Sequence, residues 1–325
     1  MAFANTSVTD IIATTIQSRS KQIADNVTKN NALLARLNQR GNIRTISGGN
    51  TILEELSFAE NGNAGFYSGY DLLPVATQDV ISAAEFSIKQ LACPVVMSGL
   101  EMLQNSGKEA FIDLLEARIN VAEATMANKL AQSIYSDGTG SSGKEVTGLN
   151  AAVPAAPTTG TYGGIDRATW TFWRSALYDF STNTVTPSAT TIQNGLNTLW
   201  ASLVRGSDRP DLIILDNTYW SYYMSSLQAL QRFADPSTGN LGFPTLKFMD
   251  ADVVLDGGIG GYCPSATGFM LNTKYISLRP HKDRNMVSLS PNKRYAINQD
   301  AEVQILAWAG NLTCRGAQFQ GRIQN

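Results

Sequence analysis

Apolar residues recur sparsely, at intervals of three or four positions, through the first part of the chain. This spacing predicts helix over residues 7–40, with a break near Asn30 and Asn31 and an end at Gly41. The apolar stripe is too thin to hold such a segment in place by itself. We therefore expect residues 1–50 to form an N-terminal arm that lies over another surface.

The longest regular apolar stripe lies in residues 106–137. Ser106 and Glu109 fit a capping box at its start, and Gly138 provides the stop. At 1.5 Å per residue a helix of this length spans roughly 45 Å, which is long for a globular protein. The stripe consists of Phe111, Leu115, Ile119, Ala122, Met126 and Leu130.

Between residues 51 and 92 the pattern changes to alternation, which predicts two long strands joined by a glycine-rich turn. The turn segment, ENGNAGFYSGYDLLP, places Phe66, Tyr67 and Tyr70 at the tip of this hairpin. Three aromatic side chains at an exposed tip are explained if another chain covers them. A hairpin folded back onto its own domain explains them equally well. The inward-facing positions are Ile52, Leu56 and Phe58 on the first strand and Phe86 and Ile88 on the second.

Residues 188–265 alternate between helical and strand patterns. They predict a helix closed by Gly206, the apolar strand Leu212–Leu215, and a second helix capped by Asn217. From Thr245 onward the chain reads as short strands separated by glycine-rich or proline-containing turns. With the hairpin and the long helix, these elements indicate an α+β protein, and 325 residues suffice for about two domains.

Composition adds a hint about association. Charged residues make up 16% of the chain, whereas about 25% is typical. Low surface charge suits a subunit covered by neighbours, because charge is depleted at interface cores, although low-charge monomers also exist. The net charge of −2, without a basic run, argues against direct binding of nucleic acid, since neutralising phosphates requires a cationic patch. This charge remains compatible with a protein that encloses nucleic acid without binding it directly.

The sequence offers little support for enzymatic chemistry. His281 is the single histidine, stands in a polar stretch and has no accompanying G-x-S-x-G motif. Gly138–Lys144 matches G-x-x-x-x-G-K, but it follows a predicted helix, and Glu145 stands where a phosphate loop carries Ser or Thr. Glu54 and Glu55 alternate along a strand, so they cannot share a proton. We expect no catalytic, cofactor-binding or metal-binding residues, and therefore no enzyme.

The cysteines and the N-terminus bear on the cellular compartment. Cys93, Cys263 and Cys314 are far apart and odd in number, which favours free thiols in a reducing environment. The N-terminus lacks the basic and apolar regions of a signal peptide, and no stretch of 18 apolar residues could span a membrane. We expect a protein made in a cytoplasm, without a membrane partner.

Three local sequences carry a resemblance to a known family. They are GGIDRATWTFWRS (163–175), FMLNTKYISLRPHKDRN (269–285) and NQDAEVQILAWAGNLTC (298–314). Together with the order of elements, they resemble the major capsid proteins of tailed bacteriophages with the Hong Kong 97-type fold. The similarity covers most of the chain and is carried mainly by residues 160–325. These sequences support strands and turns rather than an active site.

The resemblance implies a function and a domain plan. The chain would self-assemble as pentamers and hexamers into an icosahedral head that encloses double-stranded phage DNA without sequence-specific binding. It would reside in the virion capsid and assemble in the cytoplasm of a bacterial host. The implied plan is an N-terminal arm (1–50), an extended hairpin loop that overlaps a neighbour (51–92), a peripheral domain (93–187 and 266–325) with a spine helix (106–137), and an α/β axial domain (188–265).

The resemblance also implies partners. Some family members begin with a long scaffolding segment, but here the hairpin starts near Thr51 and leaves too little chain for one. A separate scaffolding protein is therefore implied, with a portal and a cement or decoration protein as further partners. Some members join subunits through a lysine-to-asparagine isopeptide bond. This chain has no lysine between Lys29 and Lys89, so we expect no such cross-link.

Two alternatives stay open at this point. An encapsulin-like compartment shell would share the fold and enclose protein cargo, and its gene would lack portal and terminase neighbours. A cytoplasmic α/β enzyme with unrecognised chemistry would run as a discrete monomer or dimer, whereas a shell would run as megadalton particles.

Overall fold

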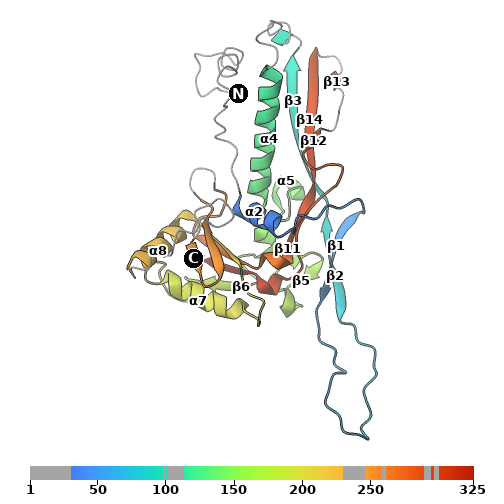
Figure 1. The fold of residues 1–325 in the computed structure, drawn as a ribbon, viewed down its shortest axis with the longest axis vertical. Coiled ribbons are helices and arrows are strands. Elements are labelled where there is room, and N and C mark those ends of the chain that lie inside the picture. The colour runs from blue at the N-terminus through green and yellow to red at the C-terminus, as the bar shows by residue number, and fades with distance from the viewer. Residues whose placement is uncertain are drawn as a thin grey trace.

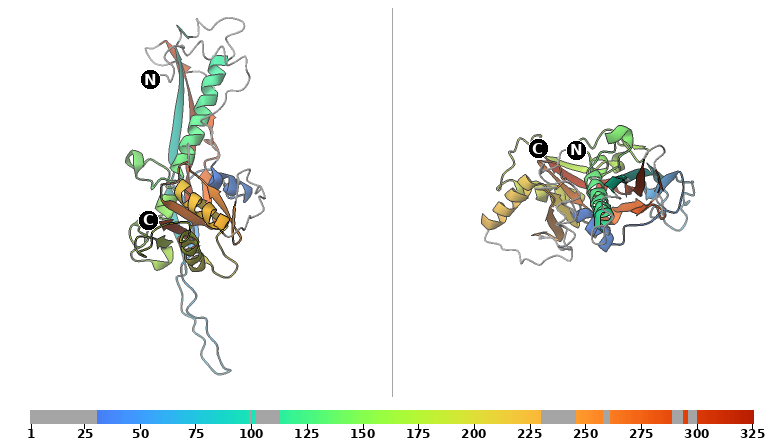
Figure 2. Two further views of the ribbon diagram at one scale, coloured as in Figure 1. Left: turned by 90° about the vertical axis from the view of Figure 1, so that its left-hand side faces the viewer. Right: turned by 90° about the horizontal axis from the view of Figure 1, so that it is seen from above.

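The computed structural model describes residues 31–98, 100–101, 113–229, 246–257, 261–288, 294–295 and 300–325. The molecule is elongated: a long helix and two long strands extend to one end, and a hairpin extends to the other (Figure 1). A helix-flanked sheet lies to one side between these ends. Seen from the side, the hairpin continues the line of the long helix and strands (Figure 2).

A six-stranded mixed sheet forms the side lobe. Its strands run in the order β6-β15-β10-β7-β9-β8, with parallel pairing of β6 with β15 and of β7 with β9. All four residues of β7 and all five of β10 are buried, as expected for strands covered on both faces. The strands are β6 (Ala176–Asp179), β7 (Leu212–Leu215), β8 (Leu246–Phe248), β9 (Ala251–Leu255), β10 (Thr267–Leu271) and β15 (Gly321–Gln324).

This sheet separates two hydrophobic cores. Alternate residues of β7 point to opposite faces, so Ile213 and Leu215 join one core while Leu212 and Ile214 join the other. Helices α7 (Ile192–Leu203) and α8 (Asn217–Ala229) contribute apolar side chains to the first core. The second core contains residues of the long helix, the long strands and the root of the hairpin.

The predicted elements of this lobe form with two differences. Helix α7 and strand β7 have the predicted apolar positions, but α8 is capped by Asp216 rather than Asn217. The Asp216 carboxylate accepts hydrogen bonds from the backbone N–H groups of Thr218 and Tyr219, whereas Asn217 is already helical. The second difference concerns β6, β10 and β15. The sequence placed these strands in the peripheral segments 93–187 and 266–325, but in the structure they belong to the same sheet as β7 and β9. The domain division itself stays a prediction.

The second large sheet is built around one long strand. Strand β14 (Ala301–Cys314) pairs antiparallel with β3 (Lys89–Ser98) along residues 301–310. Its other side pairs with β11 (Ile276–Pro280), β12 (Val287–Ser288) and β13 (Arg294–Tyr295). Helix α4 (Asp113–Ser133) runs beside β3 (Figure 1). This arrangement makes a long, narrow half of the molecule.

The predicted long helix is shorter at its end. Helix α4 stops at Ser133, before the predicted end at residue 137, because the chain turns there and the Ile134 carbonyl accepts a hydrogen bond from Leu149 N at 2.6 Å. The predicted capping box at Ser106 and Glu109 lies outside the described residues. Helix α4 buries the predicted positions Ala122, Met126 and Leu130.

The N-terminal arm is described from residue 31, and the earlier part of the predicted helix lies outside the described residues. Asn31 is extended and its side chain caps α2 (Ala32–Gln39), which agrees with the predicted break. Gly41 follows the helix with φ +66°, the left-handed conformation expected at such a stop. Residues 42–46 then run alongside β11.

The hairpin has shorter strands than predicted. Strands β1 (Thr51–Ser57) and β2 (Ile81–Ser87) pair antiparallel from Thr51↔Ser87 to Ser57↔Ile81. The predicted hairpin ended at residue 92, but residues 89–92 belong to β3, because their backbone pairs with β14. The remaining short elements are α5 (Gly140–Gly143), α6 (Leu149–Ala152), β4 (Thr161–Tyr162), β5 (Ile165–Asp166), η1 (Thr171–Trp173), η2 (Thr273–Tyr275) and η3 (Ala317–Phe319).

Candidate intersubunit surfaces

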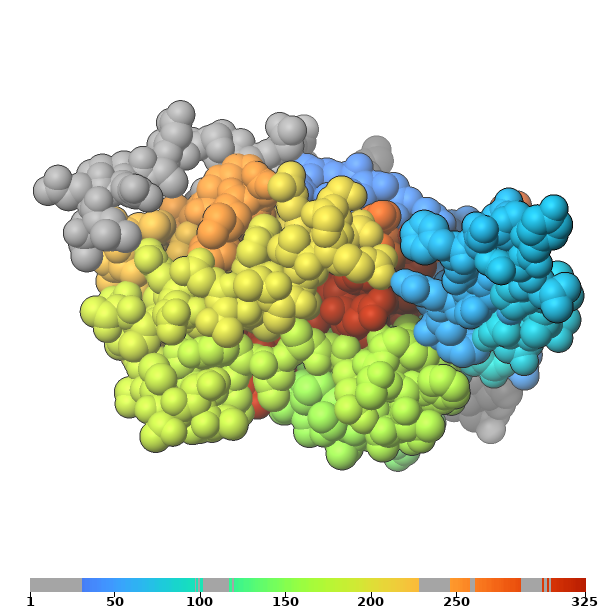
Figure 3. Space-filling view, turned by 90° about the horizontal axis from the view of Figure 1, so that it is seen from below, coloured from blue at the N-terminus to red at the C-terminus, as the bar shows by residue number. Residues whose placement is uncertain are grey.

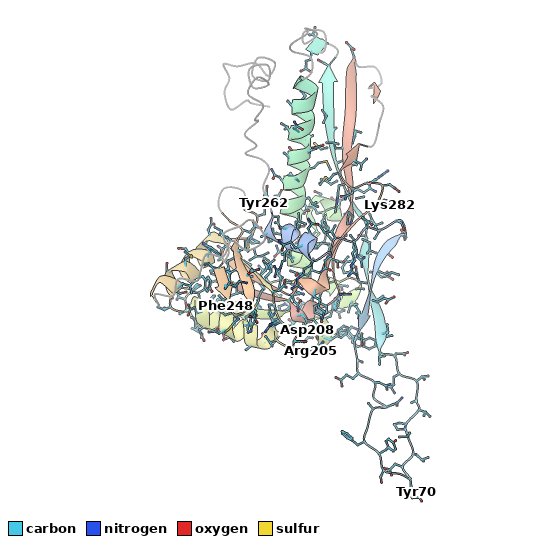
Figure 4. All side chains as sticks on the ribbon, in the orientation of Figure 1. Tyr70, Arg205, Asp208, Phe248, Tyr262 and Lys282 are labelled. Carbon is cyan, nitrogen blue, oxygen red and sulfur yellow. The ribbon has the colours of Figure 1, made fainter. Side chains whose placement is uncertain are left out.

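Residues 58–80, here called the hairpin loop, project from the end of the molecule as a long connection between β1 and β2 (Figure 4). Few hydrogen bonds cross it. Phe58 N donates to Val80 O at 3.1 Å, and Asn63 Nδ2 donates to Ala76 O at 2.5 Å. Viewed from the hairpin end, the hairpin stands at one edge of the molecule (Figure 3). The loop therefore has no core of its own.

The three aromatic residues predicted at the tip lie in this loop with exposed side chains. Relative exposure is 110% for Phe66, 68% for Tyr67 and 104% for Tyr70. No aromatic ring contact within the described ranges includes them. Sequence reasoning missed the apolar run that follows them, although the uninterrupted string LLPV was a usable signal. The loop also exposes Leu72, Leu73 and Val75.

A buried ion pair holds the root of the hairpin. Glu54 occupies an inward-facing position on β1 between Ile52 and Leu56. Arg279 Nε donates to Glu54 Oε1 at 2.6 Å, and Thr313 Oγ1 donates to the same oxygen at 2.9 Å. This pair joins the hairpin to β11 and β14. Sequence reasoning missed it, although a glutamate between two inward-facing apolar positions was the available signal.

Aromatic packing fixes the second strand of the hairpin. The rings of Phe86 and Tyr162 lie 5.1 Å apart between centroids, and Trp173 lies 5.9 Å beyond Tyr162. Trp173 Nε1 donates to Tyr162 O, and Glu85 N donates to Gly163 O. Gly163 has φ +58°, and a Cβ there would stand 3.0 Å from the Phe86 ring, so glycine is required at this contact. The root of the hairpin is therefore packed against the body of its own subunit.

Ion pairs attach the arm helix to the side lobe. Arg36 on α2 pairs with Asp211 at 3.1 Å and with Asp252 at 3.3 Å. Arg40, at the end of the same helix, pairs with Asp211 at 3.1 Å. Both acidic residues are buried, so removing their partners would leave uncompensated charge. The described start of the arm is thus firmly docked.

A further carboxyl group lies where the arm, α4 and the six-stranded sheet meet. Asp256, just after β9, accepts hydrogen bonds from Tyr135 Oη and from Asn31 Nδ2, the latter at 3.1 Å. Tyr262 N donates to its other oxygen at 3.4 Å. Burial raises the pKa of Asp256 and also that of Tyr135. No cation forms an ion pair with Asp256 in the part of the chain that the structure describes.

The residues considered for enzymatic chemistry do not come together. Gly138–Lys144 follows a helix, as predicted, and the Glu145 carboxylate beside it accepts a hydrogen bond from Ser136 Oγ at 2.8 Å. His281 lies half-buried at a different place, beside residues 42–46. Among the described residues, no group of three or more His, Cys, Asp or Glu side chains could hold a metal ion.

The three cysteines carry free thiols at separate places in the fold. Cys93 and Cys263 are half-buried, Cys314 is buried, and all three thiols are free. Burial raises the pKa of Cys314 to about 12, so this thiol stays protonated. None of the helices within the described ranges combines the length and apolar content that crossing a lipid bilayer requires.

Comparison with known proteins identifies the fold. No family model and no curated protein matches the chain. Among solved structures, the capsid of Cyanophage A-1(L) is similar with a TM-score of 0.62 at 17% identity, over 88% of this chain and 92% of that one. The capsid of an empty GTA particle is similar with a TM-score of 0.61 at 12% identity, over 91% and 90%. The SrpI encapsulin of Synechococcus elongatus PCC 7942 is similar with a TM-score of 0.51 at 8% identity, over 98% and 95%.

These likenesses span 88% or more of this chain and 90% or more of each solved one. The chain is an α+β protein with the Hong Kong 97-type capsid fold, as predicted from the sequence.

Proposed function

We propose that the chain is a major capsid protein of a tailed bacteriophage, which assembles with copies of itself as pentamers and hexamers into an icosahedral head. The observation that carries this proposal is the hairpin loop, which exposes Phe66, Tyr67 and Tyr70 on a capsid fold. In a lone subunit these side chains stay in water, whereas a neighbouring subunit would cover them. Obligate interfaces commonly bury more than about 2,000 Å², enough for such a loop and the surface beneath it.

The proposed head encloses double-stranded DNA without sequence-specific contacts. The net charge of −2 supports this, because a protein that grips DNA needs an excess of cations. The head would assemble in the cytoplasm of the host bacterium and remain as the virion capsid. The partners that we propose for this role are a separate scaffolding protein and a portal, with a cement or decoration protein as an additional partner where the head is decorated.

An encapsulin-like compartment is the second candidate. The likeness to the SrpI encapsulin over 98% of the chain favours it, since that solved structure is an encapsulin complex. Both candidates are shells, so they differ in contents rather than in assembly.

The test is to express the chain together with the genes that flank it and to examine the lysate by size-exclusion chromatography and electron cryo-microscopy. We expect megadalton icosahedral particles with nuclease-protected DNA inside. Particles that contain protein cargo instead would favour the compartment. A discrete monomer or dimer under all conditions would contradict both shells and favour the α/β enzyme.

A further inference from the structure

The turn that follows β11 holds two cations on a fixed backbone. His281 N donates to Ala309 O, and Ala309 N donates to Arg284 O, both at 2.8 Å, so β14 holds the turn at both ends. Lys282 N donates to Ile46 O at 2.8 Å and ties the same turn to the arm. The side chains of Lys282 and Arg284 are exposed. Their backbone positions are therefore set before any partner binds.

A groove of about 580 Å³ opens beside this turn, next to the root of the hairpin, where Figure 4 shows Lys282. Its polar lining consists of Asn50, Ser87, Gln90, His281 and Arg284. None of the described residues that line it is Asp, Glu, Phe, Tyr or Trp. The groove thus offers hydrogen-bond donors and a cation to a ligand. It contains no carboxylate that would repel an anion and no large aromatic ring on which a nucleic-acid base could stack.

The cations at this groove have no partners of opposite charge. Arg44, Lys282 and Arg284 are all exposed, and none of them forms an ion pair with another described residue. Arg44 lies on the segment 42–46, which runs alongside β11 and meets the turn at its end. Asp283 is the acidic residue of that turn, so the group keeps a net positive charge. We call these three cations and the groove the cationic groove.

Exposed cations on the side lobe differ, because they have carboxylate partners. Lys274 Nζ lies 2.8 Å from Asp208 Oδ1, and Arg209 Nη1 lies 2.5 Å from Asp250 Oδ2. The net charge of −2 averages over such pairs and over the unpaired cations alike. Cations without a partner in their own subunit create a local positive potential that attracts a polyanion. The cationic groove is therefore a local exception to the charge balance of the chain.

We infer that the cationic groove contacts the sugar-phosphate backbone of the duplex DNA that the proposed head encloses. This inference rests on the proposed function and goes beyond it by assigning a contact surface. Cations and small polar donors bind phosphate oxygens without reading the bases, so the contact is independent of sequence. Sites for single strands stack bases on aromatic side chains, which this groove lacks. Three cations make each contact weak, and a shell repeats the contact in every copy.

Charge reversal in the full-length chain tests the groove, with a short fluorescent duplex as the probe and fluorescence anisotropy as the measurement. We expect the affinity of unassembled wild-type chains to fall with salt at a log–log slope of about −2.7, from about 0.9 for each of three phosphates. Lys282→Glu/Arg284→Glu should lower the affinity at low salt at least about tenfold and flatten the slope to less than about −1. Two duplexes of different sequence should bind equally well.

Two matched variants control this experiment. Lys129→Glu/Arg209→Glu makes the same change of charge at two exposed cations that do not line the groove, and it should alter the affinity less than about twofold. Lys282→Arg/Arg284→Lys keeps the charge of the groove and should bind as the wild type does. Circular dichroism of each variant checks that it folds.

Electron cryo-microscopy of particles tests the contact in the shell itself. We expect density against Lys282 and Arg284 in particles filled with DNA, and none at the same place in empty particles. A groove that faces the outside of the shell would overturn the inference.

The remaining outcomes separate the two claims. Wild-type chains that form no particles under any condition would overturn the proposed function. Wild-type particles together with a groove variant that binds DNA as well as the Lys129/Arg209 control would overturn only the groove contact. A groove variant that binds DNA normally but fails to assemble would assign the groove to a protein partner and likewise overturn the inference.

Discussion

Strand β7 and the hairpin loop contain similar apolar residues in opposite surroundings. Leu212 to Leu215 are fully buried, whereas Leu72 is 98% exposed and Val75 is 90% exposed. The strand is covered on both faces by its own chain, so its apolar side chains stabilise the subunit directly. The loop has no such cover. Apolar residues alone therefore do not identify a core. If the proposed function is correct, they stabilise the subunit in β7 and the assembly in the hairpin loop.

The largest expected effect comes from making the same change in both regions. Phe269→Ala on β10 removes a fully buried ring and should lower the free energy of unfolding by about 3–5 kcal/mol. Phe66→Ala is the matched control, and it should change that free energy by less than about 0.5 kcal/mol because the ring is exposed. Chemical denaturation of unassembled subunits measures both. Similar losses for the two variants would mean that the loop packs on its own subunit.

The root of the hairpin should behave like the core, not like the loop. Arg279→Met leaves the buried Glu54 carboxylate without its cation, which we expect to lower the free energy of unfolding by about 3 kcal/mol. The double variant Glu54→Leu/Arg279→Met removes both charges and should recover most of this loss. Urea denaturation of the two variants decides the matter. If the double variant is as unstable as the single one, packing rather than charge holds the root.

Local pattern was enough for the elements whose stability depends on near neighbours. The apolar spacing at Ile192 to Leu203 and the run Leu212–Leu215 predicted α7 and β7 because a helix face and a buried strand leave a direct periodic trace. The glycine-rich tip between two alternating segments likewise predicted a hairpin with its aromatic residues exposed.

Long-range pairing could not be predicted in this way. Glu54 and Arg279 are separated by 225 residues in the sequence, and nothing in the sequence around either residue indicates that the other is its partner. The early end of α4 depends on a hydrogen bond from Leu149, and the position of β10 and β15 depends on which strands they pair with. The pattern of one sequence contains no information on such long-range partners.

A smaller effect should depend on pH. Burial raises the pKa of Asp256 above its ordinary value of about 3.9, so ionisation of this group disfavours the folded state. Its contribution to stability is fully present below that ordinary pKa and is lost as the pH rises through the raised value. Asp256→Asn cannot ionise, so its melting temperature relative to the wild type should rise as the pH increases above about 4. Parallel melting curves for the two proteins across this range would show that Asp256 titrates normally.

The hairpin tip should separate folding from assembly. Replacing Phe66, Tyr67 and Tyr70 with Ser should leave the free energy of unfolding within about 0.5 kcal/mol of the wild type, since all three side chains are exposed. The same variant should assemble poorly, because the apolar surface that a neighbour would bury is gone. Particle yield and particle melting temperature are the measurements. Normal yield of equally stable particles would show that the tip is not an intersubunit contact.

For Lys89→Arg we expect no effect on the mature shell, whose subunits should remain without covalent cross-links. A lysine can displace ammonia from an asparagine side chain only when its amine is unprotonated and lies near a neighbour's amide. The hairpin loop has no lysine, and Lys89 lies past the hairpin root on β3, where its Nζ donates to Gly143 O at 2.5 Å. Its amine is thus held by its own chain, far along the sequence from the loop that would reach a neighbour. We expect wild-type and Lys89→Arg particles, boiled in detergent with reductant, to run as a single band near 35 kDa. Reductant-resistant multimers that are present in the wild type and absent from the variant would show that Lys89 forms a covalent cross-link. Shell stability would then depend on covalent bonds between subunits as well as on burial in the core and at the loop.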